Sequence, residues 1–170
     1  QEVEGLLRGL GAGRGLGEAT SQELLDSLPF LQACMKETLR LWPPALTVRR
    51  VCTREAVLPG GAAVPQGLGV VVHLWSMHRH PEMFPRALEW IPERWLPEGE
   101  ALAPLHSGAY LPFGVGPRAC IGARLGHLEV LVLLATVLPR VALEAREGFE
   151  PEPGQAIALR TRGARGMAVA

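Results

Sequence analysis

This 170-residue sequence lacks an excess of either charge, a paired set of cysteines and a long apolar run. It carries 17 basic and 17 acidic side chains, and this balance predicts no broad electrostatic attraction to nucleic acid or to a membrane. The three cysteines, Cys34, Cys52 and Cys120, show no paired spacing, which argues against a disulfide scaffold or a zinc site and favours a reducing compartment. The longest strongly apolar helical run, about residues 125–138, is shorter than the roughly 20 residues that cross a bilayer.

A signal peptide, an internal repeat and an initiating methionine are also missing, and the sequence starts at Gln1. We therefore expect the chain to be a fragment of a longer protein. Residues 9–17 are glycine-rich, which predicts a flexible linker. The expected organisation is a linker over residues 1–19, followed by one folded part over residues 20–170.

One stretch, residues 110–122, places a cysteine among glycines and prolines. An apolar helical pattern starts at Ala123, so Cys120 is expected just before the N-terminus of a helix. The positive end of the helix dipole and the charge of Arg118 favour a thiolate at that position. Glycine permits unusual backbone conformations or close approach to a flat partner, and three lie here: Gly114, Gly116 and Gly122.

A thiolate in such a loop is either a nucleophile or a metal ligand, or else the cysteine is a buried structural one. A nucleophile needs a base, and the only histidine nearby in sequence is His127, which nothing in the sequence places at Cys120. A single thiolate can serve as the axial ligand of haem iron, because the porphyrin fills four coordination positions.

The pattern Phe113-x-x-Gly116-x-Arg118-x-Cys120-x-Gly122 resembles the haem-binding signature of the cytochrome P450 family and matches it at every defined position. The resemblance implies that Cys120 is the proximal thiolate ligand of haem b and that Arg118 meets a haem propionate. It also implies that Phe113 packs near the sulfur and that the glycines allow close approach to the porphyrin.

Apolar spacing predicts a helix that starts at Pro29, ends at Leu41 and carries Glu37 and Arg40 on one face. By themselves these two residues could form an ordinary surface ion pair. However, they resemble the Glu-x-x-Arg helix of the same family, and residues 92–95 resemble its Pro-Glu-Arg-Phe segment, with tryptophan in place of phenylalanine. The resemblance implies a buried structural network of Glu37, Arg40 and Arg94.

Short strands are expected between and after these motifs, at 46–52, 55–58, 62–64, 69–74, 140–146, 155–160 and 166–170. The strand at 69–74 is expected to be buried. A helix is also expected at 20–26, a further helical turn at 75–80 continuing to residue 85, and an irregular loop at 96–109. His78 and His80 are interpreted as loop or helix-surface histidines rather than as a metal pair.

The resemblance extends to the first of these strands, which would belong to a small sheet beside the haem. It implies that Arg50 is a second propionate-binding arginine, with Arg49 as its less favoured neighbour. It further implies that Ala45, Leu46 and Val48 line the substrate pocket.

The implied fold class is α+β, mainly α: the C-terminal part of the cytochrome P450 fold. The implied function is that of a haem-thiolate monooxygenase, which inserts one oxygen atom from O2 into a lipophilic organic substrate with electrons from a reductase or ferredoxin. No catalytic residue beyond the haem ligand is expected, because the family's distal helix is not found in the sequence. We expect little activity from the isolated chain.

Other interpretations of the sequence stay open. The chain could be a truncated, non-catalytic haem-binding fragment, a family member acting as an isomerase or lyase, or, less consistently, a cysteine hydrolase. An intracellular location is expected, and any membrane anchor, for example to the endoplasmic reticulum, would lie outside this chain.

Overall fold

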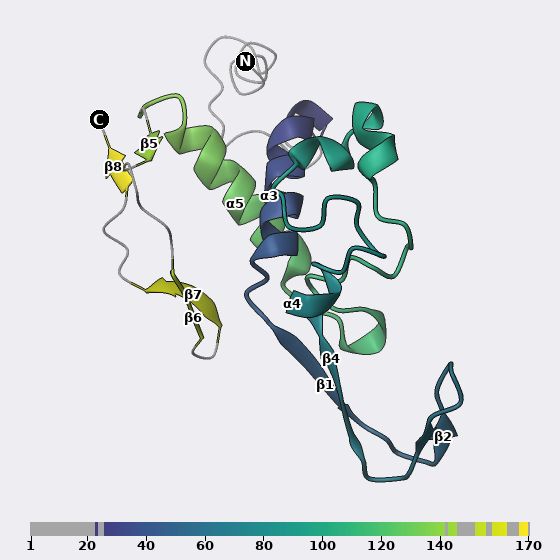
Figure 1. Ribbon diagram of the computed structural model, residues 1–170. Coiled ribbons are helices and arrows are strands. Elements are labelled where there is room, and N and C mark those ends of the chain that lie inside the picture. Colours follow the sequence, from purple (N-terminus) through teal and green to yellow (C-terminus); the bar gives the residue numbers. More distant parts are fainter. Residues whose placement is uncertain are drawn as a thin grey trace.

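The computed structural model describes residues 23, 26–141, 143–145, 152–155, 158–162 and 167–169 (Figure 1). The linker predicted over residues 1–19, and most of the helix predicted at 20–26, lie outside these residues. The longest helices are α3 (Pro29–Leu41) and α5 (Ala123–Val137). They are joined by small two-stranded sheets, short helices and turns, which confirms the α+β class.

Helix α3 begins and ends where the prolines of the sequence predict. Pro29 occupies its first turn, where its missing N–H and fixed φ cost nothing. The chain leaves the helix at Trp42, whose N–H donates to the carbonyl of Thr38 at 2.7 Å, and Pro43 follows. The buried side of α3 is both apolar and charged, and it packs against the 3-10 helix η2 (Pro92–Trp95). Its buried residues are Ala33, Met35, Glu37, Arg40 and Leu41.

Strands β1 (Thr47–Val51) and β4 (Gly69–His73) pair antiparallel, and with the hairpin between them they form an arm, residues 47–73, that extends from the helices (Figure 1). The hairpin consists of β2 (Ala56–Val57) and β3 (Ala63–Val64), as predicted. Its turn contains two glycines in the left-handed region of φ, Gly60 and Gly61.

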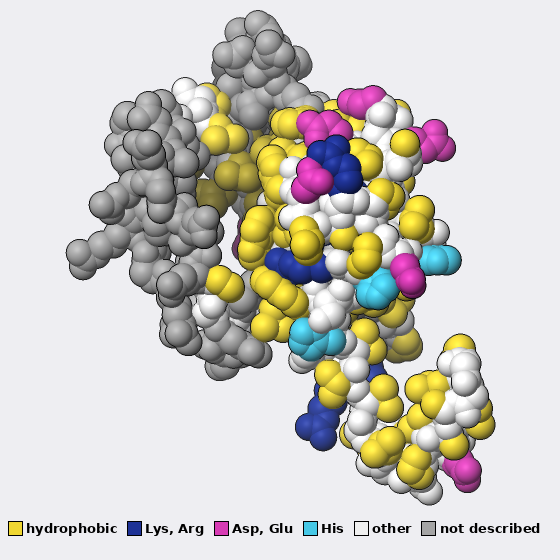
Figure 2. Space-filling view, viewed as in Figure 1, with side chains coloured by type: hydrophobic (Ala, Val, Ile, Leu, Met, Phe, Trp, Pro, Cys, Tyr) yellow, Lys and Arg dark blue, Asp and Glu magenta, His cyan; other side chains and the backbone are white. Residues whose placement is uncertain are grey.

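The predicted burial of the strand at 69–74 is wrong. Along β4 the side chains are mostly exposed, with Val71 at 54% and Val72 at 41%. Among the described residues, β4 pairs with β1 alone. Apolar side chains therefore lie open along the arm, where they appear yellow in Figure 2.

The segment between the arm and the cysteine runs through α4 (Leu74–Met77) and then through turns rather than the helix predicted to continue to residue 85. Two 3-10 helices follow, η2 and η3 (Pro97–Leu102), where an irregular loop was predicted. Gly99 lets η3 approach η2, because a Cβ there would lie 1.8 Å from the carbonyl oxygen of Glu93. A small core of Phe84, Ala87 and Ala109 lies in this segment.

After α5 the chain forms two further antiparallel pairs. β5 (Leu143–Ala145) pairs with β8 (Met167–Val169), and the two strands lie within those predicted at 140–146 and 166–170. β6 (Glu152–Gln155) and β7 (Leu159–Arg162) pair antiparallel, so the single strand predicted at 155–160 is wrong: its ends belong to two different strands. No helix among the described residues is long and apolar enough to cross a membrane.

Candidate functional site

The cysteine loop, residues 110–122, is folded back on itself by backbone hydrogen bonds. The N–H of Gly114 donates to the carbonyl of Leu111 at 3.0 Å, and the N–H of Cys120 donates to the carbonyl of Phe113 at 2.8 Å. Helix α5 begins directly afterwards, with Gly122 at its N-cap. Cys120 therefore lies two residues before a helix cap, as the sequence predicts.

Two glycines of the loop adopt conformations that other residues rarely take. Gly114 has φ +73° and Gly116 has φ +74°, both in the left-handed region. At Gly116 it is the backbone conformation that favours glycine. Nothing lies within 4 Å of a Cβ built on it, so the space beside this residue is open. A Cβ on Gly122 would make only an ordinary van der Waals contact with the sulfur of Cys120, at 3.9 Å.

The side chains of this loop face solvent. Cys120 and Arg118 are exposed, and the exposure of Ile121 beside them reaches 105% of its reference value. Arg118 lies in the 3-10 helix η4 (Gly116–Arg118) and makes no hydrogen bond to another described residue. The thiol and the guanidinium are thus both exposed on a glycine-rich loop.

Phe113 and His127 contact each other, with ring centroids 5.0 Å apart. The Nδ1 of His127 lies 3.0 Å from the carbonyl oxygen of Ala123 in the first turn of α5, so this nitrogen donates. No hydrogen bond joins His127 to Cys120 in the described part of the chain. His127 is therefore not bonded to Cys120 as the base of a cysteine nucleophile would be.

In the interior, the Glu37 carboxylate accepts hydrogen bonds from several donors. Arg40 approaches as a two-pronged donor, with Nε 2.8 Å from Oε2 and Nη2 2.9 Å from Oε1. Arg94 donates through Nε at 2.9 Å, and the N–H of Ile91 donates at 3.0 Å. Trp95 completes the set through Nε1 at 3.0 Å. The structure brings Glu37, Arg40 and Arg94 together in the interior. Glu37 and Arg40 therefore do not form an ordinary surface ion pair.

The two arginines of this network also hold backbone carbonyls. The remaining donors of Arg40 reach the carbonyls of His78, Ala87 and Glu89 at 2.7, 2.6 and 2.9 Å. Arg94 donates to carbonyl oxygens of Pro85 and Leu102. α3 is thereby fastened to segments more than 35 residues further along the chain, since 38 positions separate Arg40 from His78.

Electrostatics keep the carboxylate of this network charged. Burial raises the pKa of Glu37, but the hydrogen bonds from Arg40, Ile91 and Arg94 outweigh it and hold the pKa below its usual value. Each buried charge thus has partners, which is the condition under which a buried ion pair is tolerated.

The other residues expected from the resemblance lie on the arm or just before it, and they are less enclosed. Arg50 is exposed on β1, and its Nη1 donates to the carbonyl of Arg49 at 2.8 Å. Ala45 is exposed, while Leu46 and Val48 are half-buried. The stretch from Ala45 to Arg50 thus combines apolar side chains with the two basic side chains of Arg49 and Arg50.

The prediction of surface histidines is wrong for His78, which is fully buried, and right for His80, which is exposed. Sequence analysis also missed the polar role of Trp95. Its indole N–H is a donor that the family's phenylalanine lacks, and this difference was the available signal. No cluster of three potential metal-ligating side chains occurs in the described ranges.

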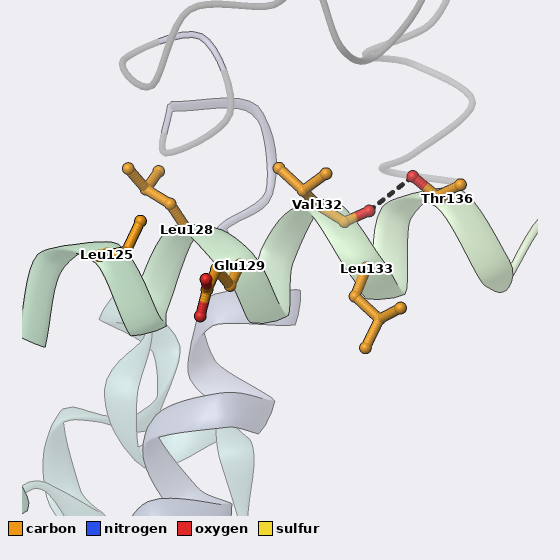
Figure 3. A pocket seen from close by; sticks show the side chains of 6 residues that line it. All are labelled: Leu125, Leu128, Glu129, Val132, Leu133 and Thr136. Carbon is orange, nitrogen blue, oxygen red and sulfur yellow. Dashed lines mark hydrogen bonds between the residues drawn. The ribbon is translucent and has the colours of Figure 1, made fainter. Parts of the chain in front are cut away.

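An open hollow of about 510 Å³ lies along α5 (Figure 3). It is lined by Leu125, Leu128, Glu129, Val132, Leu133 and Thr136. Its walls are almost entirely apolar, and Glu129 is the one charged side chain that lines it.

Comparison with known proteins agrees with this geometry. The family model described as "Cytochrome P450" matches residues 9–164. The chain is 36% identical to leukotriene-B4 omega-hydroxylase 3 of Mus musculus over 164 residues, and 33% identical to taurochenodeoxycholic 6 alpha-hydroxylase of Sus scrofa over 162 residues. These matches cover 96% and 95% of the chain but only 30% of each relative.

A solved structure gives the same result for the fold. The crystal structure of a cytochrome P450 (CYP102L1) superimposes with a TM-score of 0.80 at 28% sequence identity. The match covers 99% of this chain and 38% of the solved one. The described elements therefore correspond to part of a larger fold.

Proposed function

The chain belongs to the cytochrome P450 family, and from this premise we propose that it supplies the haem-thiolate part of a monooxygenase. This enzyme would insert one oxygen atom from O2 into a lipophilic organic substrate. The observation that carries the proposal is the exposed thiol of Cys120, held by a glycine-rich loop at the start of α5. The buried network of Glu37, Arg40 and Arg94 would support that loop structurally.

The residues of the loop fit haem b. A single exposed thiol suits an iron that already has four porphyrin ligands. The open space over Gly116 permits close approach of a flat macrocycle, and the Arg118 guanidinium is available to a propionate. Arg50 is proposed as a second propionate partner. Haem, when bound, would supply the activation of O2 with electrons from a reductase or ferredoxin.

Two observations support a lipophilic substrate. Both mammalian relatives described above are named as hydroxylases, one of leukotriene B4 and one of taurochenodeoxycholic acid. In this chain, the residues proposed to line the pocket are apolar: Ala45, Leu46 and Val48.

The proposal is tested by the carbon monoxide difference spectrum of the reduced, haem-loaded protein. We expect the red-shifted Soret band of a thiolate-ligated haem, and its loss in Cys120→Ala. Cys52→Ala is the matched control, because Cys52 is half-buried on the arm, 2.7 Å from the carbonyl oxygen of Arg54. A red-shifted band that survives in Cys120→Ala would refute the assignment. Substrate oxidation with a reductase then tests the monooxygenase activity itself.

A further inference from the structure

His78 links the buried charged network to the cysteine loop through its backbone and its side chain at once. Its carbonyl accepts from Nη1 of Arg40 at 2.7 Å, and its ring Nε2 accepts the N–H of Leu111 at 3.0 Å. We propose that His78 is a positioning residue that sets the cysteine loop for haem ligation. This inference rests on the proposed function of Cys120.

The hydrogen bond to Leu111 defines the state of the imidazole. Because Nε2 accepts, the proton of the neutral ring is on Nδ1, which is buried and has no partner in the described structure. Burial, together with the charges of Arg40 and Arg79, lowers the pKa of His78 to about 4. The ring is therefore neutral at pH 7 and keeps its acceptor for the loop.

Neighbouring aromatic rings fix the orientation of that acceptor. The ring of Tyr110 lies 5.5 Å from the imidazole, and Phe84 meets it edge-on at 6.5 Å. Tyr110 is itself held by the ring of Trp95 at 4.5 Å and by the carbonyl of Lys36, to which its hydroxyl donates at 3.1 Å. The imidazole is thus packed between two rings with its Nε2 toward the N–H of Leu111, at the start of the cysteine loop.

From Leu111 a short sequence of hydrogen bonds leads to the ligand. The carbonyl of Leu111 accepts the N–H of Gly114, and the carbonyl of Phe113 accepts the N–H of Cys120. Loss of the hydrogen bond to the Leu111 N–H would therefore loosen the turn from Leu111 to Gly114. Phe113, in this turn, accepts the hydrogen bond from the N–H of Cys120. His78 acts on Cys120 through this turn and does not touch it.

The unpartnered Nδ1 indicates why a histidine is used. A buried polar atom without a partner is unfavourable, and an apolar side chain would fill the same space without it. The Nε2 acceptor is what an apolar replacement would lose. The cost of the unpartnered nitrogen is consistent with a requirement for that acceptor.

The test compares His78→Leu and His78→Gln with His80→Gln in the full-length protein. His80 is exposed, two residues away, and its Nδ1 accepts only the local N–H of Glu82 at 3.3 Å, so it is the matched control. Amide hydrogen exchange at Leu111 reports the hydrogen bond itself. We expect exchange to accelerate by about tenfold in His78→Leu, as for loss of one hydrogen bond, and by less in His78→Gln, whose side-chain oxygen can accept.

The second readout is the fraction of bound haem that shows the red-shifted carbon monoxide band. We expect this fraction to fall in His78→Leu, to recover partly in His78→Gln and to stay unchanged in His80→Gln. Leu28→Ala, a fully buried substitution at the N-terminal end of α3, controls for general destabilisation and should leave the thiolate fraction of bound haem unchanged.

Unchanged Leu111 exchange in both His78 variants would overturn the inference. So would an equal loss of the thiolate fraction in His78→Leu and Leu28→Ala. Failure of the proposed function has a different signature, because the unsubstituted protein would then show no red-shifted band, while Leu111 exchange would still respond to His78.

Discussion

Arginine is used in opposite ways in the two halves of this site. Arg40, in the interior, donates through all of its guanidinium nitrogens to Glu37 and to three backbone carbonyls. Arg118, on the cysteine loop, is exposed and makes no hydrogen bond to another described residue. A guanidinium whose donors are all occupied is part of the framework, whereas one with free donors is available to an anionic partner.

The glycines of the two halves show the same contrast. Gly99 is needed for space, because a side chain there would collide with the backbone of Glu93. Gly116 is needed for its conformation, at φ +74°, and has nothing within 4 Å of a Cβ position. The interior is closely packed around fixed contacts, while the loop is shaped by its backbone and left open on one side.

The largest effect is expected from Glu37→Gln, which removes the anion of the buried network. The substitution leaves Arg40 and Arg94 buried without their common anion, and removal of one partner from a buried ion pair typically costs about 3–5 kcal/mol. Urea unfolding should show this loss of stability. Glu89→Gln is the control, because it disrupts the ion pair with Arg86 at the exposed surface, and we expect little change. Similar unfolding midpoints for the two variants would show that the buried ion pairs of Glu37 stabilise the protein no more than the exposed pair of Glu89 and Arg86.

A pH dependence of stability should follow from His78. Its pKa of about 4 in the folded protein lies below the unfolded value of 6.5, so between these values the unfolded state binds more protons. Stability should be full above pH 6.5 and should fall by roughly 3 kcal/mol as the pH decreases through 6.5 to 4. The lowered pKa of Glu37 adds a further loss at lower pH.

Unfolding by urea at several pH values measures this effect. His78→Gln should flatten the decrease between pH 6.5 and 4, while His80→Gln should leave it in place. If both variants retain the full decrease, His78 is not its source.

The smallest effect is expected from Trp95→Phe, which tests one donor of the buried Glu37 network. Phenylalanine keeps a ring against Tyr110 but removes the N–H that reaches Glu37 at 3.0 Å. Because Glu37 retains its other donors, we expect a loss of about 1 kcal/mol in the free energy of unfolding. Trp90→Phe is the control, since that indole is exposed and donates to the hydroxyl of Thr38 at 3.2 Å. An equal effect of both variants would argue against a special role for Trp95.

Much of the local structure could be predicted from the sequence because the signals are local. Pro29 and Pro43 bound α3, β-branched residues give β1, and the glycines of the loop mark unusual backbone positions. The burial of β4 could not be predicted this way. An apolar strand looks the same in sequence whether or not another element covers it.

Long-range polar contacts were also beyond the sequence. Trp95 and Glu37 are 58 positions apart, and His78 and Leu111 are 33 apart. Nothing in the spacing of residues indicates that the indole N–H of Trp95 donates to the Glu37 carboxylate. Nor does it indicate that His78 is buried.

The sequence by itself determined the family, the two long helices and the place of Cys120 just before the second of them, because a ten-residue signature and helical periodicity are written in neighbouring residues. The tertiary structure alone decided which charges are enclosed, which donors stay free and how His78 joins the network to the loop. The physical reason is that burial and hydrogen bonding depend on contacts between segments, and a buried polar group is stable only when those contacts are complete.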